Sequence, residues 1–328
     1  MVRHRWLGAF RGRLHRGPRI GVVLPAAVLL AAALLSSCVS VPTDPVDTSV
    51  APSDAAVDDE RVCLVLSIGT QRGLAQIGAI QALEELGERP ECVFGTSVGS
   101  IVGAVYAYAP DEPIDLHGED LVHTYAAATR RVAVGRAVCA GVTTWMLTGG
   151  LALPLAIGGA AAVTTPGADL ERLHESLDRH LHGAGFSDLE IEFATAYKQH
   201  LGETVETVIA TDGCVADAVA CSVNNPFTFR DTDMSRFDAG ADRMLAVPIQ
   251  DAYELFHPDR IIAINTTGHP AVYMPDIACE ITEIVVPFDS EMLEVGRVIT
   301  ERGRRALYDR GYQAVMGALG HKAAGQGR

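Results

Sequence analysis

Apolar and polar positions along this chain form blocks that predict strands and helices in turn. Residues 61–67 are a short apolar run rich in branched side chains, which is typical of a buried strand. Between Leu74 and Leu86 apolar residues recur every three positions, which indicates a helix. Residues 92–94 are a second strand-like run, and residues 98–109 are a second predicted helix. The chain therefore begins its folded part as strand, helix, strand, helix.

The alternation continues further along the chain. Strand-like runs lie at 189–194, 207–210, 261–265 and 284–286, and helical stretches lie at 170–182, 217–223 and 291–319. Strands interleaved with helices predict a mainly parallel sheet covered on both faces. We expect a three-layer α/β/α domain over residues 61–320, followed by a tail at 321–328.

The first 37 residues differ from the rest. Six arginines and no acidic residue precede an uncharged, mostly apolar run from residue 20 to 35. A run of this length that contains Pro25 is shorter than the roughly 20 residues that span a bilayer, and the pattern is typical of a secretory signal peptide.

The residues Leu35-Ser36-Ser37-Cys38 end this segment. They resemble the lipobox of bacterial lipoproteins, in which the cysteine becomes the lipidated first residue. The resemblance implies that Cys38 is a lipid attachment site and that the exported protein is anchored to a membrane of the bacterial cell envelope.

Residues 38–60 contain prolines, acidic residues and small side chains without a helical period, so they are expected to be a disordered tether. Removal of residues 1–37 takes the formal net charge from −15 to −21, because that segment carries six arginines and no acidic residue. Such an acidic protein has no electrostatic attraction for nucleic acid. Nothing in the sequence indicates an oligomeric state.

Six cysteines remain after Cys38, namely Cys63, Cys92, Cys139, Cys214, Cys221 and Cys279. Disulfides can persist in an exported protein, but the sequence does not select a pairing. No Cys-x-x-Cys or clustered His-Cys spacing is present, so no zinc site is expected. We expect no metal and no cofactor.

Residues 137–168 carry no charge, and six glycines and two prolines interrupt them. A buried connection and an apolar lid beside the active site both fit this composition. A membrane span is disfavoured, because it would put Ser97 and Asp238 on opposite sides of the bilayer.

The pentapeptide Gly95-Thr96-Ser97-Val98-Gly99 lies between a predicted strand and a predicted helix. In this context Gly-x-Ser-x-Gly is typical of a nucleophile on a sharp turn, with glycines that permit close packing. The amide of Val98 is then a candidate oxyanion donor at a helix N-terminus.

The turn Ile68-Gly69-Thr70-Gln71-Arg72-Gly73 joins the first strand to its helix. Free amides at a helix start bind developing negative charge, so Gly69, Thr70 and Gln71 are candidate donors to the oxyanion. The glycine spacing fits neither a dinucleotide-binding nor a P-loop motif.

These motifs, followed by Asp238-Ala239-Gly240, resemble those of the patatin-like phospholipase family. Its members carry a Gly-Gly-Gly-x-Arg/Lys-Gly loop, a Gly-x-Ser-x-Gly turn and a downstream Asp-Gly-Gly/Ala motif. The resemblance implies that Ser97 and Asp238 form a catalytic dyad that acts through an acyl-enzyme. It also implies that Arg72, Gly73, Gly95, Gly99 and Gly240 are motif residues, and that the substrate is a membrane lipid or another acyl ester.

The sequence departs from the family at Ile68 and Thr70, which replace two loop glycines, and at Ala239. A residue other than glycine tolerates a positive φ poorly, so the amide cradle is expected to be distorted. Asp212, which precedes Gly213, is a rival to Asp238. The family order favours Asp238.

Two other functions stay open. One is an α/β-hydrolase triad of Ser97, Asp238 and His269, since His269 follows a predicted strand. The other is a non-catalytic or weakly active lipoprotein that binds lipid on a hydrolase scaffold.

Overall fold

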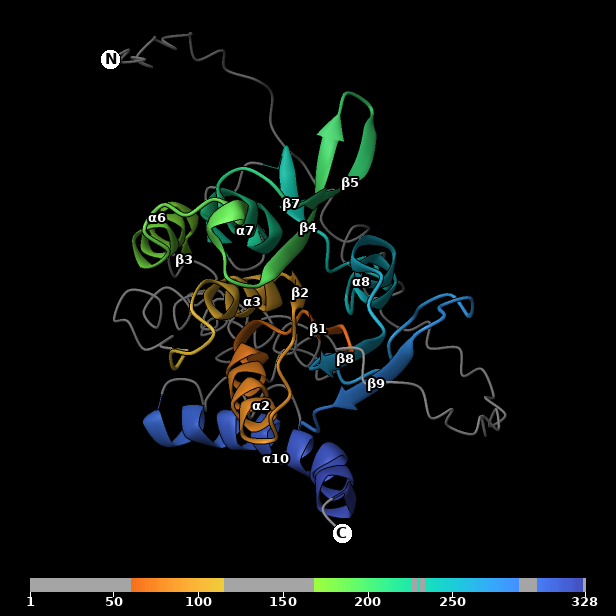
Figure 1. Ribbon diagram of the computed structural model, residues 1–328. Coiled ribbons are helices and arrows are strands. Elements are labelled where there is room, and N and C mark those ends of the chain that lie inside the picture. Colours follow the sequence, from red (N-terminus) through yellow and green to blue (C-terminus); the bar gives the residue numbers. More distant parts are fainter. Residues whose placement is uncertain (1–59, 115–167, 226–228, 231–233, 289–299, 327–328) are drawn as a thin grey trace, which may run out of the picture. The chain divides into compact units, whose positions relative to one another are not determined.

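The computed structural model describes residues 60–114, 168–225, 229–230, 234–288 and 300–326 (Figure 1). The expected signal peptide, Cys38, the tether up to residue 59 and residues 137–167 of the uncharged segment lie outside them. No helix within the described ranges is both long and apolar enough to span a bilayer.

The centre of the fold is a seven-stranded sheet. Strands run in the order β5-β4-β2-β1-β8-β9, and β7 pairs with β4. Pairs β1–β2, β1–β8, β2–β4 and β8–β9 are parallel, whereas β4–β5 and β4–β7 are antiparallel. The strands are β1 Val62–Leu66, β2 Cys92–Thr96, β4 Glu192–Leu201, β5 Thr204–Ala210, β7 Arg236–Asp238, β8 Arg260–Asn265 and β9 Glu280–Val285.

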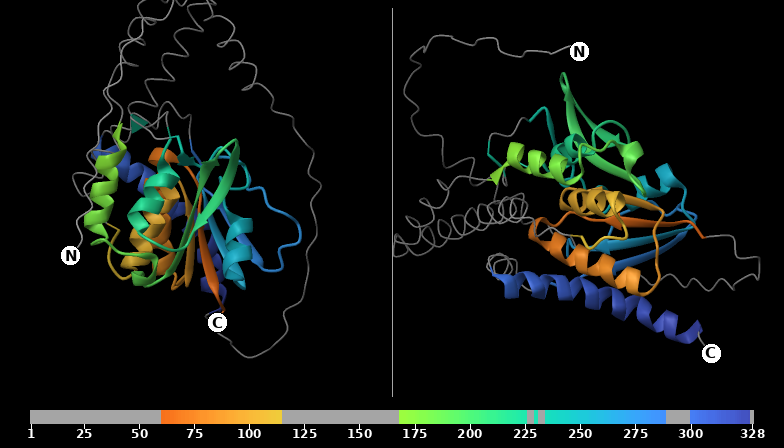
Figure 2. Two further views of the ribbon diagram at one scale, coloured as in Figure 1. Left: turned by 90° about the horizontal axis from the view of Figure 1, so that it is seen from above. Right: turned by 60° about the vertical axis from the view of Figure 1, so that its left-hand side comes forward.

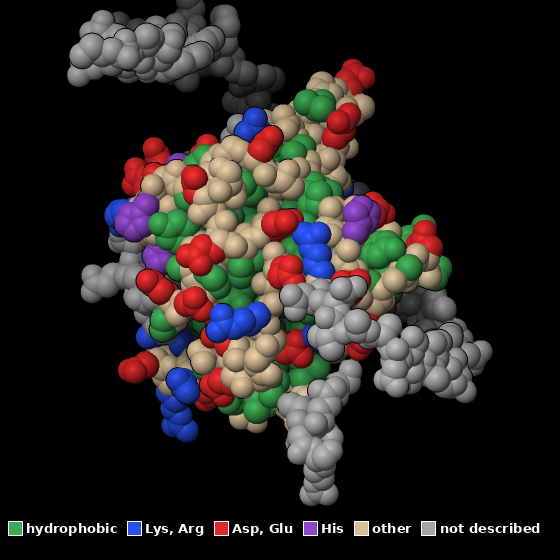
Figure 3. Space-filling model, viewed as in Figure 1, with side chains coloured by type: hydrophobic (Ala, Val, Ile, Leu, Met, Phe, Trp, Pro, Cys, Tyr) green, Lys and Arg blue, Asp and Glu red, His purple; other side chains and the backbone are tan. Residues whose placement is uncertain are grey.

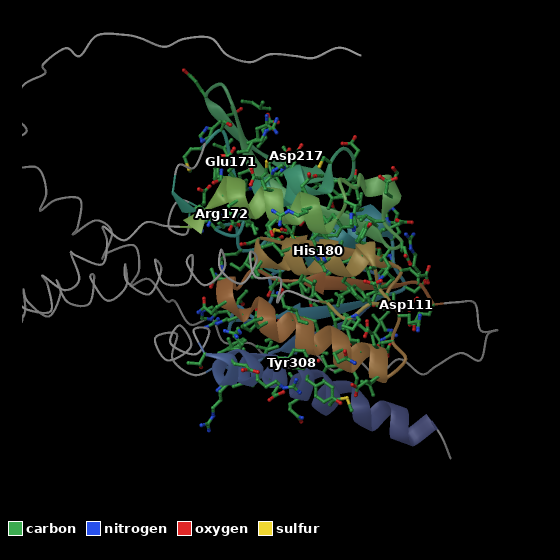
Figure 4. The ribbon with its side chains drawn as sticks, turned by 90° about the vertical axis from the view of Figure 1, so that its left-hand side faces the viewer. Asp111, Glu171, Arg172, His180, Asp217 and Tyr308 are labelled. Carbon is green, nitrogen blue, oxygen red and sulfur yellow. The ribbon has the colours of Figure 1, made fainter. Side chains whose placement is uncertain are left out.

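Helices cover both faces of the sheet, as Figure 2 shows in its left view. One face packs against α2 Gly73–Glu85, α3 Val98–Tyr108, α6 Leu170–His180, α7 Val215–Val223 and α10 Glu301–Gln326. The other face packs against α8 Ile249–Phe256. In Figure 4 the larger layer extends from Asp217 on α7 to Tyr308 on α10. The predicted three-layer α/β/α architecture with a mainly parallel sheet is confirmed.

The strands have the burial that their sequences imply. All five residues of β1 and all five of β2 are buried, because the central strands lie between two helical layers. The antiparallel strand β5 is mostly exposed at the edge of the sheet. Parallel strands end at the same edge, so the turns after β1, β2 and β8 meet there.

Several elements differ from the sequence prediction. The predicted strand 189–194 is displaced, since β4 covers residues 192–201 and pairs with β5 as a long hairpin. Helix α8, strand β7 and the two-stranded sheet of β3 Ala168–Asp169 and β6 Phe229–Arg230 were not predicted. Each of these is short, so it offers little periodic signal.

The five cysteines in the described residues are free thiols, and Cys139 lies outside them. Cys63 and Cys92 are register partners on β1 and β2, and both are fully buried. Burial raises the pKa of the Cys63 thiol well above its ordinary value.

Candidate active site

Ser97 lies on a tight turn between β2 and α3. Its φ of 55° and ψ of −125° form a strained backbone conformation for a residue other than glycine. A Cβ at Gly95 would overlap the carbonyl oxygen of Gly99, and a Cβ at Gly99 would overlap that of Leu66. Both glycines of the pentapeptide are therefore required by close backbone packing, as expected for a nucleophile turn.

Two further serines hold the backbone of this turn. The amide of Ser97 donates to Oγ of Ser222 on α7 at 3.0 Å, and that hydroxyl donates to the carbonyl of Ala196 on β4 at 2.8 Å. Oγ of Ser100 donates to the carbonyl of Ser97 at 2.5 Å. Ser222 is fully buried and was not predicted from the sequence. Its role depends on an approach of α7 to the turn, which no local pattern reveals.

Asp238 ends β7, at the position paired with Tyr197 of β4. Its amide donates to the carbonyl of Asn224 at 3.0 Å, and the amide of Gly240 donates to its Oδ1 at 2.7 Å. Side-chain hydrogen bonds also join the carboxyl group to Ser97 and Asn225. The structure thus brings the serine and the aspartate together from distant parts of the sequence.

The pKa of Asp238 is raised to about 6. Burial of the carboxyl group is the main cause, because it disfavours the charged form. Hydrogen bonds from the Gly240 amide and the Ser97 and Asn225 side chains stabilise the carboxylate and partly offset this effect. A carboxylate with a pKa near 6 is a better proton acceptor than an ordinary aspartate and is still mostly ionised at pH 7.

The predicted oxyanion loop follows β1. Thr70–Arg72 form a short 3₁₀ helix (η1) with Gly69 at its N-cap. The first amides of a helical segment have no acceptor within it, so Gly69, Thr70 and Gln71 have N–H groups available to a ligand. The amide of Ile68 instead donates to the carbonyl of Ala246 at 3.0 Å.

Thr70 has a φ of 47°, the left-handed region that favours glycine. The expected strain at a replaced glycine therefore occurs at this residue. The other replaced position, Ile68, has a different consequence. A Cβ at Gly240 would lie 2.7 Å from Cγ2 of Ile68 and 3.0 Å from Oδ1 of Asp238. The isoleucine side chain packs beside the loop that carries the aspartate.

Arg72 ties this loop to the end of β8. Its Nη1 donates to the carbonyl oxygens of Thr266 at 2.8 Å and Thr267 at 3.2 Å. Its guanidinium group lies over the ring of Phe288, 4.5 Å from the centroid. The side chain is almost fully buried, so Arg72 acts here as an anchor of the loop backbone.

A cavity of about 680 Å³ brings these groups together. Of the predicted site residues, it is lined by Gly69, Thr70, Gln71, Arg72, Ser97, Asp238 and Gly240. Gly73, Gly95, Val98 and Gly99 do not line it. Val98 is buried as the first residue of α3, next to Ser97. The cavity also has apolar lining from Met234, Phe237, Val247 and Val272.

The two rival residues differ in position. Asp212 is exposed in the turn after β5 and does not line the cavity. His269 does line it, on the exposed turn after β8. Within the described part of the chain, the ring of His269 makes no hydrogen bond with Ser97 or Asp238. Its backbone is fixed instead, since Nδ2 of Asn265 donates to its carbonyl at 2.6 Å.

Comparison with known proteins identifies the family of this chain. Residues 64–253 match the family model described as "Patatin-like phospholipase". Lysophospholipase NTE1 of Phaeosphaeria nodorum is 54% identical over 50 residues, which are 15% of this chain and 3% of that protein. Patatin-like phospholipase domain-containing protein ZK370.4 of Caenorhabditis elegans is 45% identical over 51 residues, which are 16% of this chain and 4% of that protein.

This chain therefore spans only a few per cent of the length of these curated relatives. Among solved structures, VipD from Legionella pneumophila is similar with a TM-score of 0.37 and 14% identity. The similarity covers 80% of this chain and 67% of that one.

Proposed function

Because this chain belongs to the patatin-like phospholipase family, we propose that it hydrolyses acyl esters of lipids, with Ser97 as the nucleophile and Asp238 as the base. The observation that carries the proposal is that Ser97 and Asp238 line one cavity with apolar lining, where the Ser97 side chain stabilises the Asp238 carboxylate. A cavity of this size can accept an acyl chain.

The proposed reaction has two halves. Oγ of Ser97 attacks the acyl carbonyl carbon while Asp238 accepts the hydroxyl proton. The carbonyl oxygen becomes an oxyanion, which the amides of Gly69, Thr70 and Gln71 and of Val98 stabilise. The intermediate then expels the alcohol, which takes the proton from Asp238 and leaves an acyl-enzyme.

The second half regenerates the enzyme. Water attacks the acyl-enzyme carbonyl while Asp238 accepts a proton from the water. The second oxyanion collapses, the bond to Ser97 breaks, and Oγ recovers its proton from Asp238. The fatty acid leaves. No metal or cofactor takes part in these steps.

An activity-based fluorophosphonate probe tests the two roles. Wild-type protein should be labelled, Ser97→Ala should not, and Asp238→Asn should be labelled at least about 100-fold more slowly, which is typical for loss of a general base. Asp212→Asn is the matched control and should behave like wild type. Equal labelling of wild type and Ser97→Ala would contradict the proposal.

A weakly active lipid-binding protein is the second candidate. It is favoured by Thr70, whose φ of 47° strains the loop that supplies the donors. Loss of one oxyanion donor reduces turnover by about 10² to 10³. Wild-type protein that binds lipid but takes up no probe would support this candidate.

We further propose that Cys38 is lipidated and anchors the protein to a membrane of the bacterial cell envelope. The sequence Leu35-Ser36-Ser37-Cys38 after an apolar run supports this proposal. Mass spectrometry of the N-terminal peptide from the membrane fraction should show an acylated Cys38. A Cys38→Ala variant that is processed and retained like wild type would contradict it.

A further inference from the structure

The connection between β8 and β9 exposes three consecutive large side chains. Val272 is 39% exposed, Tyr273 is 37% exposed and Met274 is 56% exposed. Pro270 and Pro275 flank them and are exposed as well. We name residues 270–275 the apolar loop. Exposed apolar groups are costly in water, so three in succession mark a contact surface.

Two polar side chains, one buried and one half-buried, fix the backbone of the apolar loop. The amide of Ala271 donates to Oε1 of Glu283 at 2.9 Å, and the amide of Met274 donates to Oε1 of Gln250 at 3.0 Å. Gln250 is itself almost fully buried. The three apolar side chains are therefore presented by a backbone that is held in place, so little ordering entropy is lost on docking.

The apolar loop adjoins the proposed active site. Val272 lines the same cavity as Ser97 and Asp238. Met234, which is 42% exposed, lines it from the chain before β7. Exposed apolar surface thus continues from the loop into the cavity. A lipid surface bound at the apolar loop would lie next to the mouth of the cavity. A lipid molecule could then pass from that surface into the cavity.

The charge near the apolar loop indicates which kind of lipid surface it would bind. Residues 261–288 contain no lysine or arginine, and they carry the acidic residues Asp276, Glu280 and Glu283. On the face shown in Figure 3, acidic side chains are spread over the surface, and several basic side chains gather at the lower left, on the side away from β8 and β9. Attraction to anionic headgroups needs clustered basic residues, so the loop suits zwitterionic or neutral lipid.

We propose that residues 270–275 dock the protein on a zwitterionic or neutral lipid surface and deliver lipid to the cavity. The loop combines Val272 and Met274, which enter the acyl region, with Tyr273, whose hydroxyl can stay at headgroup level. The delivery of lipid to the cavity rests on the proposed hydrolase function, whereas the docking on a lipid surface does not depend on that function.

The test compares full-length proteins that all carry Cys38→Ala, which removes the lipidation site. The loop variant is Tyr273→Ser/Met274→Ser, which leaves Val272 of the cavity lining unchanged. The matched control is Leu201→Ser/Val205→Ser, since both of these residues are 49% exposed on the β4–β5 hairpin and neither lines the cavity. Two rates are measured for each protein, on a dissolved short-chain ester and on phosphatidylcholine vesicles. Vesicle flotation measures binding separately.

The loop variant should lose about tenfold or more in vesicle rate and in vesicle binding, with the short-chain rate unchanged. The control should match the parent protein in all three measurements. An unchanged loop variant, equal loss of both rates, or equal loss in the control would overturn the proposal. Binding that requires anionic lipid and disappears in salt would overturn it too.

Size-exclusion chromatography with light scattering addresses a competing occupant. A parent dimer that becomes monomeric in the loop variant, without a change in vesicle binding, would assign the loop to a second copy of the chain and overturn docking on lipid. If no protein hydrolyses either substrate, the proposed function fails, and flotation still decides whether the loop docks.

Discussion

The side chain of Ile68 packs beside Gly240, so the loop expected to bind the oxyanion touches the loop that carries Asp238. A Cβ at Gly240 would approach Cγ2 of Ile68 to 2.7 Å. This contact links the two functional loops directly. Ile68, which replaces a glycine of the family pattern, therefore packs against Gly240, two residues after Asp238.

Gly240→Ala should displace Asp238 or the oxyanion loop and reduce kcat by about tenfold or more, since small misplacements of catalytic groups are costly. Ile68→Ala removes the nearest obstacle and leaves Oδ1 of Asp238 at 3.0 Å, so the double variant should recover part of the lost activity. Esterase kinetics of both single variants and the double variant measure the coupling. Additive losses in the double variant would show that the two residues act independently.

Ser222→Ala should destabilise the turn that carries Ser97. The substitution leaves the amide of Ser97 and the carbonyl of Ala196 without the hydroxyl that joins them. We expect a loss of about 1–3 kcal/mol in the free energy of unfolding, and a lower kcat. Urea denaturation measures the first. Ser187→Ala, at an exposed serine in the turn η2 (Phe186–Asp188), is the control and should leave both quantities unchanged.

Asp238 should set the acidic limb of the activity profile. Its pKa is about 6 and the base must be deprotonated, so kcat/KM for a dissolved ester should fall about tenfold per pH unit below 6 and level off above 7. Initial rates between pH 4.5 and 8 test this. A limb at pH 4, where an ordinary aspartate titrates, would contradict the proposed environment.

The same carboxyl group should reduce stability as pH rises. Its folded-state pKa of about 6 exceeds the unfolded value near 3.8, so the folded state binds more protons between these values. Stability therefore falls from about pH 4 to pH 6, by at most about 3 kcal/mol, and is constant with respect to this group above that range. The Asp238→Asn variant should be more stable than wild type at pH 8. The difference in stability between the two proteins should be smallest near pH 4. Thermal denaturation across pH measures the difference.

His269→Ala should leave esterase turnover within about twofold of wild type. His269 lines the cavity, yet its ring makes no hydrogen bond with Ser97 or Asp238 in the described residues, whereas the Ser97 side chain stabilises the Asp238 carboxylate. A loss of 10² or more with a normal fold would establish a histidine-mediated triad instead.

The sequence was sufficient for those features that depend on neighbouring residues. The buried strands β1, β2 and β8 are continuous apolar runs, and the Ser97 turn is bounded by glycines that the backbone packing requires. Both could be predicted because the signal lies within a few positions.

Features that depend on distant residues were harder to predict. Asp238 could be selected over Asp212 only by resemblance, since its approach to Ser97 requires β7 to pair with β4. The support from Ser222 requires α7 to pack beneath the turn. Helix α8 has eight residues between Pro248 and Pro258, which is too short for a clear helical period.

The position of Asp238 on β7 also has a consequence for synthesis of the protein. Ser97 directly follows β2, whereas β7 comes after both strands of the β4–β5 hairpin and joins the sheet by pairing with β4. A nascent chain that has not yet reached β7 holds the serine without its proposed base. The proposed dyad is therefore completed late in translation, and the serine gains its proposed base only when β7 has been made and has paired with β4.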